Sequence, residues 1–392
     1  MNPRGPGTPG PGSNCSTGDA MFEDLWPAGL AGLCAAILMP FAIRSRRVGH
    51  DNDFNGVQKV HDVSTSRLGG FNVFVAYLAV LAIAVCVKDA EPTPALPLML
   101  CSLPVVLVGI WEDLTHRVHP WHRLAGAVAS AALASWFATG IIARLDVPFL
   151  DDGLKYLLFV LPLTWFMVAG ACNAINLIDG AHGLAGGTTL MMFGGLAAAA
   201  AIVGDALVRD QALAMMGAII GFLVWNYPRG KVFLGDAGAY FLGFMYAELS
   251  IQIVARNPAI SAWFVIALGA YPIVETLYSM YRRRFLLRTA SMRPDAGHLH
   301  SLIYRRLVRS AHSAHAREAV RRANAHVAPR LWLHGAICLT AALLLYHNTL
   351  ALIGFTLLYA VAYARIYRSI ARTRNDDPPP PAEPVARPVA RR

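Results

Sequence analysis

The sequence predicts an all-α, polytopic integral membrane protein with about eleven transmembrane helices. Of its 392 residues, 56% are hydrophobic and only 15% are charged, whereas a soluble domain of average composition carries about 25% charged residues. Apolar runs of the length that crosses a bilayer recur along most of the chain. The basic residues are also distributed unevenly between the segments that join these runs, as the topology of a membrane protein requires.

Eleven apolar windows are expected to form the spans, with polar segments at both ends of the chain. The windows cover residues 21–43, 71–87, 96–110, 124–142, 155–172, 183–203, 212–225, 232–254, 260–281, 331–346 and 350–366. The Gly- and Pro-rich leader 1–20 and the Pro- and Arg-rich tail 367–392 cannot bury enough apolar surface to fold and are expected to be disordered. Residues 21–366 form one membrane domain, and 282–330 is its longest loop.

Charge predicts the orientation of the spans. With the N-terminus outside, most of the 34 Lys and Arg residues fall in cytoplasmic segments, and the exceptions are Arg4, Lys88, Arg144, Lys155, Arg209 and Arg256. This imbalance is the one that the positive-inside rule describes, and the reverse orientation would invert it. The net charge of +10 therefore indicates topology and contact with anionic membrane lipids. The basic run 282–330 has no interleaved stacking aromatics, so we expect no nucleic-acid partner.

Polar motifs interrupt the apolar windows, and all of them fall on the predicted cytoplasmic side. Glu112 and Asp113 are adjacent carboxylates at a helix exit; they repel each other unless a cation such as Mg²⁺ or a proton lies between them. Asn173, Asn176 and Asp179 are spaced three apart, so a helix would direct them to one side. Such oxygen-rich groups suit a hard cation or a charged ligand.

Two further motifs carry groups that suit phosphate. Asp236 follows Gly235 at the start of an apolar window, where glycine allows close approach of a phosphate and a helix N-terminus favours anions. The same stretch holds Asn226 and Lys231. Arg293, His298 and His300 form a cluster in the longest loop that could bind a diphosphate or move protons. A weaker polar loop, 61–70, contains Arg67.

Together these groups predict phosphoryl transfer between a soluble nucleotide donor and a lipid acceptor at the cytoplasmic membrane face. Such a reaction depends on positioning and on neutralising phosphate charge, which carboxylate-bound Mg²⁺ and basic side chains provide. A polytopic transporter or a scaffold without catalysis is the alternative from a different functional class. Transporters tend to carry inverted repeats with polar residues at mid-membrane, and the sequence has no evident repeat.

The motifs, in their order along the chain, resemble those of the polyprenyl-phosphate N-acetylhexosamine-1-phosphate transferases, the MraY/WecA superfamily or glycosyltransferase family 4. The resemblance rests on Ser-Arg-Leu-Gly-Gly at 66–70, Glu-Asp at 112–113, the Asn and Asp residues of 173–180, Gly-Asp-Ala-Gly at 235–238, and the histidines of 298–300. It implies a bacterial cytoplasmic (inner) membrane enzyme. The implied activity is transfer of a sugar-1-phosphate from a UDP-N-acetylhexosamine to undecaprenyl phosphate, with release of UMP and with Mg²⁺ as cofactor, Mn²⁺ being the alternative.

The resemblance also assigns roles to residues. Asp236 matches the metal-binding aspartate, with Asp113 as a second metal ligand. The residues expected in the chemistry are Glu112, Asp113, Asp179, His298 and His300. The residues expected to bind substrate are Arg67, Asn173, Asn176, His182, Asn226, Lys231 and Arg293. A homodimer is a possible assembly.

The chain departs from the family pattern at a few positions. Glu112 replaces an aspartate, His182 stands where many members have a second aspartate, and Ser301 replaces a third histidine. The weakened histidine motif favours the branch that initiates O-antigen or other surface polysaccharides. The peptidoglycan step, with a UDP-muramoyl-pentapeptide donor, is the alternative within the family. The sugar itself is not predicted.

Overall fold

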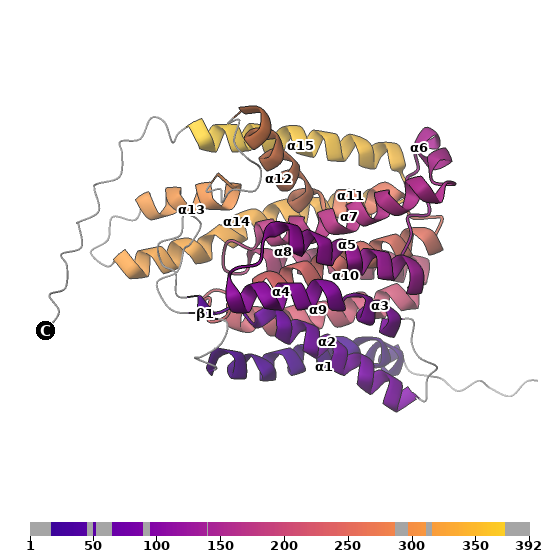
Figure 1. Cartoon of the computed structure of the whole chain (residues 1–392), viewed down its shortest axis with the longest axis horizontal. Helices are drawn as coiled ribbons and strands as arrows, with labels where there is room; N and C mark the ends of the chain where they lie inside the picture. Colours follow the sequence, from indigo (N-terminus) through magenta and orange to yellow (C-terminus); the bar gives the residue numbers. More distant parts are fainter. Residues whose placement is uncertain are drawn as a thin grey trace, which may run out of the picture.

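The structure is a computed structural model that describes residues 17–44, 50–51, 65–88, 95–138, 140–286, 297–310 and 316–372. The prediction of an all-α fold is confirmed, because the described part of the chain contains no strands beyond the two-residue β1 (His50–Asp51) and β2 (Thr65–Ser66). The long helices run side by side as one bundle (Figure 1).

All eleven predicted windows fold as helices, two of them as bent pairs. Nine windows correspond to α1 (Thr17–Arg44), α2 (Gly69–Lys88), α5 (Pro120–Phe137), α7 (Leu157–Ile178), α8 (Leu184–Val203), α9 (Ala206–Asn226), α10 (Gly235–Arg256), α14 (Ala316–Leu345) and α15 (Thr349–Arg372). The bent pairs are α3 (Ala95–Cys101) with α4 (Leu103–Thr115), and α11 (Ala262–Leu268) with α12 (Ala270–Tyr281). Shorter elements are α6 (Pro148–Gly153), η1 (Arg282–Leu286) and α13 (Leu299–Ser310).

The chain is a multi-pass membrane protein, but the predicted count of eleven spans is not confirmed. Within the described residues, seven helices are long and apolar enough to cross a membrane, or nine if each bent pair counts as one span. The pairs bend by 43° at Ser102 and by 74° at Gly269. Two predicted windows fall short of this count: the apolar part of α2 is only Gly69–Ile83, and α5 carries the polar residues His122 and Arg123 in its first turn.

The ends of the chain lie mostly outside the described residues. Helix α1 begins at Thr17 and α15 ends at Arg372, so helix covers the inner edges of the leader and tail that the sequence predicts to be disordered. Arg293, predicted to bind substrate, also falls outside the described residues.

Helix α10 is the central helix of the bundle. Its apolar, membrane-spanning part is completely buried, and the helix packs against α2, α4, α5, α7, α8 and α9. Small residues permit these contacts: a Cβ atom added at Gly70 of α2 would collide with the backbone of Gly238. A helix enclosed on all sides cannot shift without disturbing its neighbours, so the N-terminus of α10 is a fixed point for the polar groups around it.

A short backbone ladder brings the loop of Arg67 to this fixed point. Ser66 forms a parallel bridge with Val232, and the Phe233 N–H donates to the Ser66 carbonyl at 2.8 Å. The Gly69 N–H then donates to the Phe233 carbonyl at 3.0 Å. The weakest of the sequence motifs, residues 61–70, thus ends as a strand-like segment lying directly against the residues that precede α10.

Asp205 joins the opposite end of α10 to α9. It is the N-cap of α9, with Oδ1 accepting the Val208 N–H at 3.3 Å. Its Oδ2 accepts from Arg256 Nε and Asn257 Nδ2, both at 2.8 Å. Burial alone raises the pKa of Asp205, but the hydrogen bonds from Arg256, Asn257 and Val208 outweigh it and lower this pKa below its usual value. Because the pKa is depressed in the folded state, the carboxylate stabilises the fold above its unfolded-state pKa of about 4 and ceases to do so in acid.

We therefore expect Asp205→Asn to lower the stability of the folded protein by about 1–2 kcal/mol at pH 7, because hydrogen bonds to a charged acceptor are lost. The difference from wild type should shrink as the pH falls below about 4. Thermal unfolding in detergent at both pH values measures it. Asp210→Asn is the matched control, since Asp210 pairs with Arg209 on the exposed side of the same turn. An equal melting temperature for Asp205→Asn and wild type at pH 7 would contradict this role.

Candidate active site at the N-terminus of α10

Two carboxylates hold the first turn of α10. Asp113, at the end of α4, accepts the Asp236 N–H at 2.8 Å on Oδ1 and the Ala237 N–H at 2.9 Å on Oδ2. The carboxylate of Asp179, which follows α7, lies near the Gly235 N–H of the same turn. The free N–H groups at a helix N-terminus need acceptors and favour negative charge. The two predicted carboxylates thus meet at one helix end although they are 66 positions apart in the sequence, with α5, α6 and α7 between them.

Gly235 is required by the shape of this turn. Its φ is +74°, a conformation that side chains disfavour, and an added Cβ atom would lie 2.6 Å from Asp113 Oδ2. Any other residue here would push the capping carboxylate away from the helix end. From the sequence, Gly235 is predicted to allow the close approach of a phosphate. In the structure this glycine also leaves room for the Asp113 carboxylate.

Asp236 is the carboxylate of this turn that faces the cavity. It forms an ion pair with Arg123 of α5, and its Oδ1 lies 3.8 Å from Nη2 of Arg67. Arg67 also reaches Asp113 Oδ1 at 3.8 Å and His116 Nδ1 at 3.1 Å. Two guanidinium groups therefore surround one cavity-lining carboxylate, which is an arrangement that suits bound phosphate as well as a metal ion.

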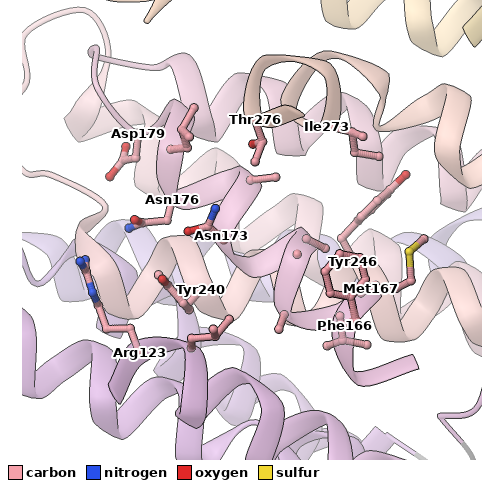
Figure 2. A pocket seen from close by; sticks show the side chains of 18 of the residues that line it. Arg123, Phe166, Met167, Asn173, Asn176, Asp179, Tyr240, Tyr246, Ile273 and Thr276 are labelled. Atoms are coloured by element: carbon pink, nitrogen blue, oxygen red, sulfur yellow. The ribbon is translucent and has the colours of Figure 1, made fainter. Parts of the chain in front are cut away.

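The predicted side-chain row on α7 lies on the same cavity. Asn173, Asn176 and Asp179 all line it, and Figure 2 shows the three side chains along the end of α7, with Arg123 and Tyr240 across from them. Glu112 lines the cavity too, and its Oε2 accepts the Val118 N–H at 2.8 Å. Asp113 itself is fully buried beneath this surface and is not among the cavity-lining residues.

The histidines approach from the other side of the cavity. His298 and His300 both line it and stack with ring centroids 5.6 Å apart. The His300 ring lies against the backbone of Gly180, where an added Cβ atom would collide with Nε2. His298 Nδ1 lies 3.2 Å from Glu275 Oε1. The loop after α7 and the start of α13 are thereby brought together, as the sequence predicts for one shared site.

Three other predicted substrate residues differ in their placement. His182 lines the cavity, buried, with its ring 5.8 Å from that of Phe233. Asn226 also reaches the cavity, but its amide is engaged by the backbone, accepting the Gly183 N–H at 2.6 Å and donating to the Val232 carbonyl at 2.7 Å. Lys231 is exposed, is not a lining residue, and has its Nζ 5.1 Å from the Trp225 ring centroid.

Several site residues were not predicted. Arg123 pairs with Asp236, Asn324 of α14 accepts the His182 N–H at 2.8 Å, and Glu275 holds His298. A signal existed for Glu275, because an ionisable residue inside an apolar window is costly and commonly functional. Arg123 contributed only to the charge count in the sequence, since nothing local to it indicates which carboxylate it meets.

The cavity combines a polar end with a long apolar wall. It has a volume of about 1310 Å³. Its polar end holds the residues described above, and its walls continue between α7, α10 and α12 over Phe166, Met167, Ile251, Ile273 and Leu277. Figure 2 shows the two parts, with Asn176 and Asp179 at one end and Phe166, Met167 and Tyr246 at the other.

The donor set fits a Mg²⁺ ion that shares its coordination with a substrate. Among the described residues no group of three or more His, Cys, Asp or Glu side chains could hold a metal by itself. Mg²⁺ does not need such a cage, because it commonly binds one or two carboxylates together with substrate phosphates and water. Asp236 is the carboxylate available for this, with Asp179 beside it at the same helix end.

Asp179 has a strongly altered acidity. Burial raises its pKa to about 7, the nearby charge of Asp236 adds to the rise, and Arg67 and the Gly235 N–H oppose it. Because the pKa is raised in the folded state, the folded protein keeps a proton that the unfolded chain releases above about pH 4. The stability of the protein therefore falls as the pH rises from about 4 to about 7.

We expect Asp179→Asn to remove this penalty. The melting temperature of the variant should exceed that of wild type by an amount that grows from pH 4 to pH 7 and then stays constant. Thermal unfolding in detergent across pH 4 to 8 is the measurement. A variant whose melting temperature runs parallel to that of wild type at every pH would show that Asp179 does not titrate in this range.

Comparison with known proteins identifies the family. Residues 95–254, which run from α3 to near the end of α10, match glycosyl transferase family 4. A phospho-N-acetylmuramoyl-pentapeptide-transferase of Bacillus subtilis is 31% identical over 261 residues, which cover 62% of this chain and 76% of that protein. The chain belongs to glycosyl transferase family 4. This is the family that the sequence motifs resemble.

Other family members that match belong to a second branch. A probable undecaprenyl-phosphate N-acetylglucosaminyl 1-phosphate transferase of Bacillus subtilis is 30% identical over 250 residues, covering 62% of this chain and 66% of that protein. An undecaprenyl-phosphate alpha-N-acetylglucosaminyl 1-phosphate transferase of Thermotoga maritima is 26% identical over 283 residues, covering 72% and 81%. Relatives of both branches are phospho-sugar transferases, so membership of the family does not determine which sugar donor this protein uses.

Proposed function

We propose that this protein transfers N-acetylhexosamine-1-phosphate from a UDP-sugar to undecaprenyl phosphate and releases UMP. The observation that carries the proposal is the single cavity in which a cluster of carboxylates, arginines and histidines continues into an apolar wall between membrane helices. A nucleotide diphosphate suits the polar end, and a prenyl chain suits the apolar part. The names of the relatives in both branches support this class of donor and acceptor.

The reaction is a displacement at phosphorus. An oxygen of the lipid phosphate bonds to the β-phosphorus of the UDP-sugar, the bond from that phosphorus to the bridging oxygen breaks, and UMP leaves with this oxygen. Bound Mg²⁺, or Mn²⁺, would supply neutralisation of the diphosphate charge. Asp236 would hold the metal, and Glu112 would orient the lipid phosphate or accept its proton. Arg67 and Arg123 would bind phosphate oxygens.

The walls of the polar end suggest how the nucleotide lies. Phe233 and His182 present neighbouring rings to the cavity, on which a flat nucleobase could stack. Asn173 and Asn176 offer amides for the ribose or the sugar. The predicted roles of Asp113 as metal ligand and of Lys231 and Arg293 as substrate residues stay predictions. Arg67, Glu112 and Asp236 would then face the cytoplasm in the inner membrane, as the charge distribution predicts.

The test is an assay of the purified protein with undecaprenyl phosphate, Mg²⁺ and a panel of UDP-sugars. We expect N-acetylglucosamine or a related N-acetylhexosamine to enter the lipid extract with an equal amount of UMP. Transfer only from UDP-muramoyl-pentapeptide would place the protein in the peptidoglycan branch, which several relatives represent. If no donor supports transfer, the proposed enzymatic function is contradicted and a transporter or scaffold function is favoured instead.

A further inference from the structure

Glu275 is a buried carboxylate on α12 that the proposed reaction does not use directly. Glu275 is only 1% exposed, and its carboxylate accepts hydrogen bonds from three groups in two other parts of the chain. Oε1 lies 3.2 Å from His298 Nδ1 and accepts the Leu299 N–H at 3.3 Å. Oε2 accepts from the hydroxyl of Tyr363 on α15. A carboxylate placed inside a membrane helix is costly unless it is paired in this way.

These bonds fix one ring of the histidine pair. A carboxylate acceptor at Nδ1 favours the tautomer that carries a proton there and leaves Nε2 as the nitrogen available to other groups. Tyr363 fixes the second oxygen, so the carboxylate cannot rotate freely. The Leu299 N–H at the start of α13 binds the same oxygen as the His298 ring, so ring and backbone are located together.

His298 contacts His300, and His300 in turn contacts the loop after α7. The two rings stack at 5.6 Å with an interplanar angle of only 6°, and His300 packs on Gly180, next to Asp179. Both histidines line the cavity, whereas Glu275 does not. Glu275 is thus one step removed from the cavity, and its contact with the polar end runs through His298.

We infer that Glu275, supported by Tyr363, is a positioning residue that holds His298 in the orientation needed for contact with the donor diphosphate. The inference rests on the proposed function and adds a residue to it. A carboxylate that orients a functional histidine through Nδ1 has a well-understood role, since it fixes both the ring and the tautomer. Loss of such a partner lowers activity by about 10- to 100-fold.

The experiment is a double-mutant cycle on the full-length protein in detergent. Glu275→Gln should reduce kcat/KM for UDP-N-acetylglucosamine about 10- to 100-fold and weaken equilibrium binding of this donor. In a His298→Ala background the same substitution should change either quantity by less than about 2-fold, because the two residues act as one unit. An equal effect of Glu275→Gln in both backgrounds, or full activity of the single variant, would overturn the inference.

Glu248→Gln is the matched control. Glu248 is a second buried glutamate in a membrane helix, 0% exposed, and its carboxylate oxygens have no hydrogen-bond partner among the described residues. Its substitution should leave kcat/KM within about 2-fold of wild type, so a loss specific to Glu275 cannot be a general effect of replacing a buried glutamate in the bundle. If Glu275→Gln melts far below this control, Tyr363→Phe replaces it in the same cycle, with a smaller expected loss.

The readouts separate this inference from the proposed function. If wild type transfers no sugar phosphate, the proposed function fails, and the cycle is completed on donor binding alone. Coupling between Glu275 and His298 in binding would then support the positioning role without turnover. Independent effects in binding would overturn it.

Discussion

Asp236→Asn is expected to reduce sugar-phosphate transfer by at least about 100-fold while leaving the fold intact. Asp236 is the carboxylate of the α10 turn that lines the cavity, and both of its oxygens face guanidinium groups, those of Arg123 and Arg67. The amide of Asn is neutral, so it can neither anchor Mg²⁺ with comparable strength nor balance the two arginines. Loss of one electrostatic element at the site of charge development costs about 10²–10³ in rate.

The fold should tolerate this substitution because the Asp236 side chain does not cap α10. Removal of its charge also ends the repulsion with Asp179, which offsets the lost pairs with Arg123 and Arg67. The backbone N–H of Asp236 is held by Asp113, and that bond does not involve the Asp236 side chain. We expect the melting temperature in detergent to stay close to that of wild type. The measurement is UMP release together with labelled sugar in the lipid extract, at saturating Mg²⁺. Near-normal turnover would remove Asp236 from the active site, and a collapsed melting temperature would mean that the side chain has a structural role.

The sequence predicts the site well where its members share one local element. Asn173, Asn176 and Asp179 follow the period of a helix, so their common direction follows from spacing alone, and the structure places all three on the cavity. The helical windows are predicted for a similar reason, since the length of an apolar run is a local property of the sequence. The bends at Ser102 and Gly269 are less visible, because they depend on how the half-helices pack against their neighbours.

Roles that depend on partners far away in the chain could not be predicted. Arg123 and Asp236 are 113 residues apart, and only the crossing of α5 beside α10 brings them together. Lys231 was predicted to bind substrate from its place in a motif that suits phosphate; its ammonium lies over Trp225 and outside the cavity lining, so this role stays a prediction. Asn226 reaches the cavity, yet its amide is engaged by two backbone groups. Sequence spacing indicates which residues lie on one element, whereas tertiary packing determines which groups each side chain contacts.

Asp113 is where the sequence and the structure give different reasons for one residue. The adjacent carboxylates Glu112 and Asp113 indicated a metal ligand or a base. In the structure, both oxygens of Asp113 accept N–H groups of α10, and the side chain is fully buried. Its contribution here is to hold the helix end that carries Asp236, because the two free N–H groups of this turn require an acceptor with two oxygens.

Asp113→Asn tests this reason directly. An Asn side chain offers one oxygen and one NH₂ group, so one buried N–H of α10 would face a second donor, at a cost of about 1–3 kcal/mol. We expect both the melting temperature and the transfer rate to fall, the rate by at least about 100-fold, because the first turn of α10 moves and carries Asp236 with it. This pattern differs from that of Asp236→Asn, in which only the rate falls. An inactive Asp113→Asn protein with the melting temperature of wild type would instead make Asp113 a chemical group of the site, as the sequence motif predicted.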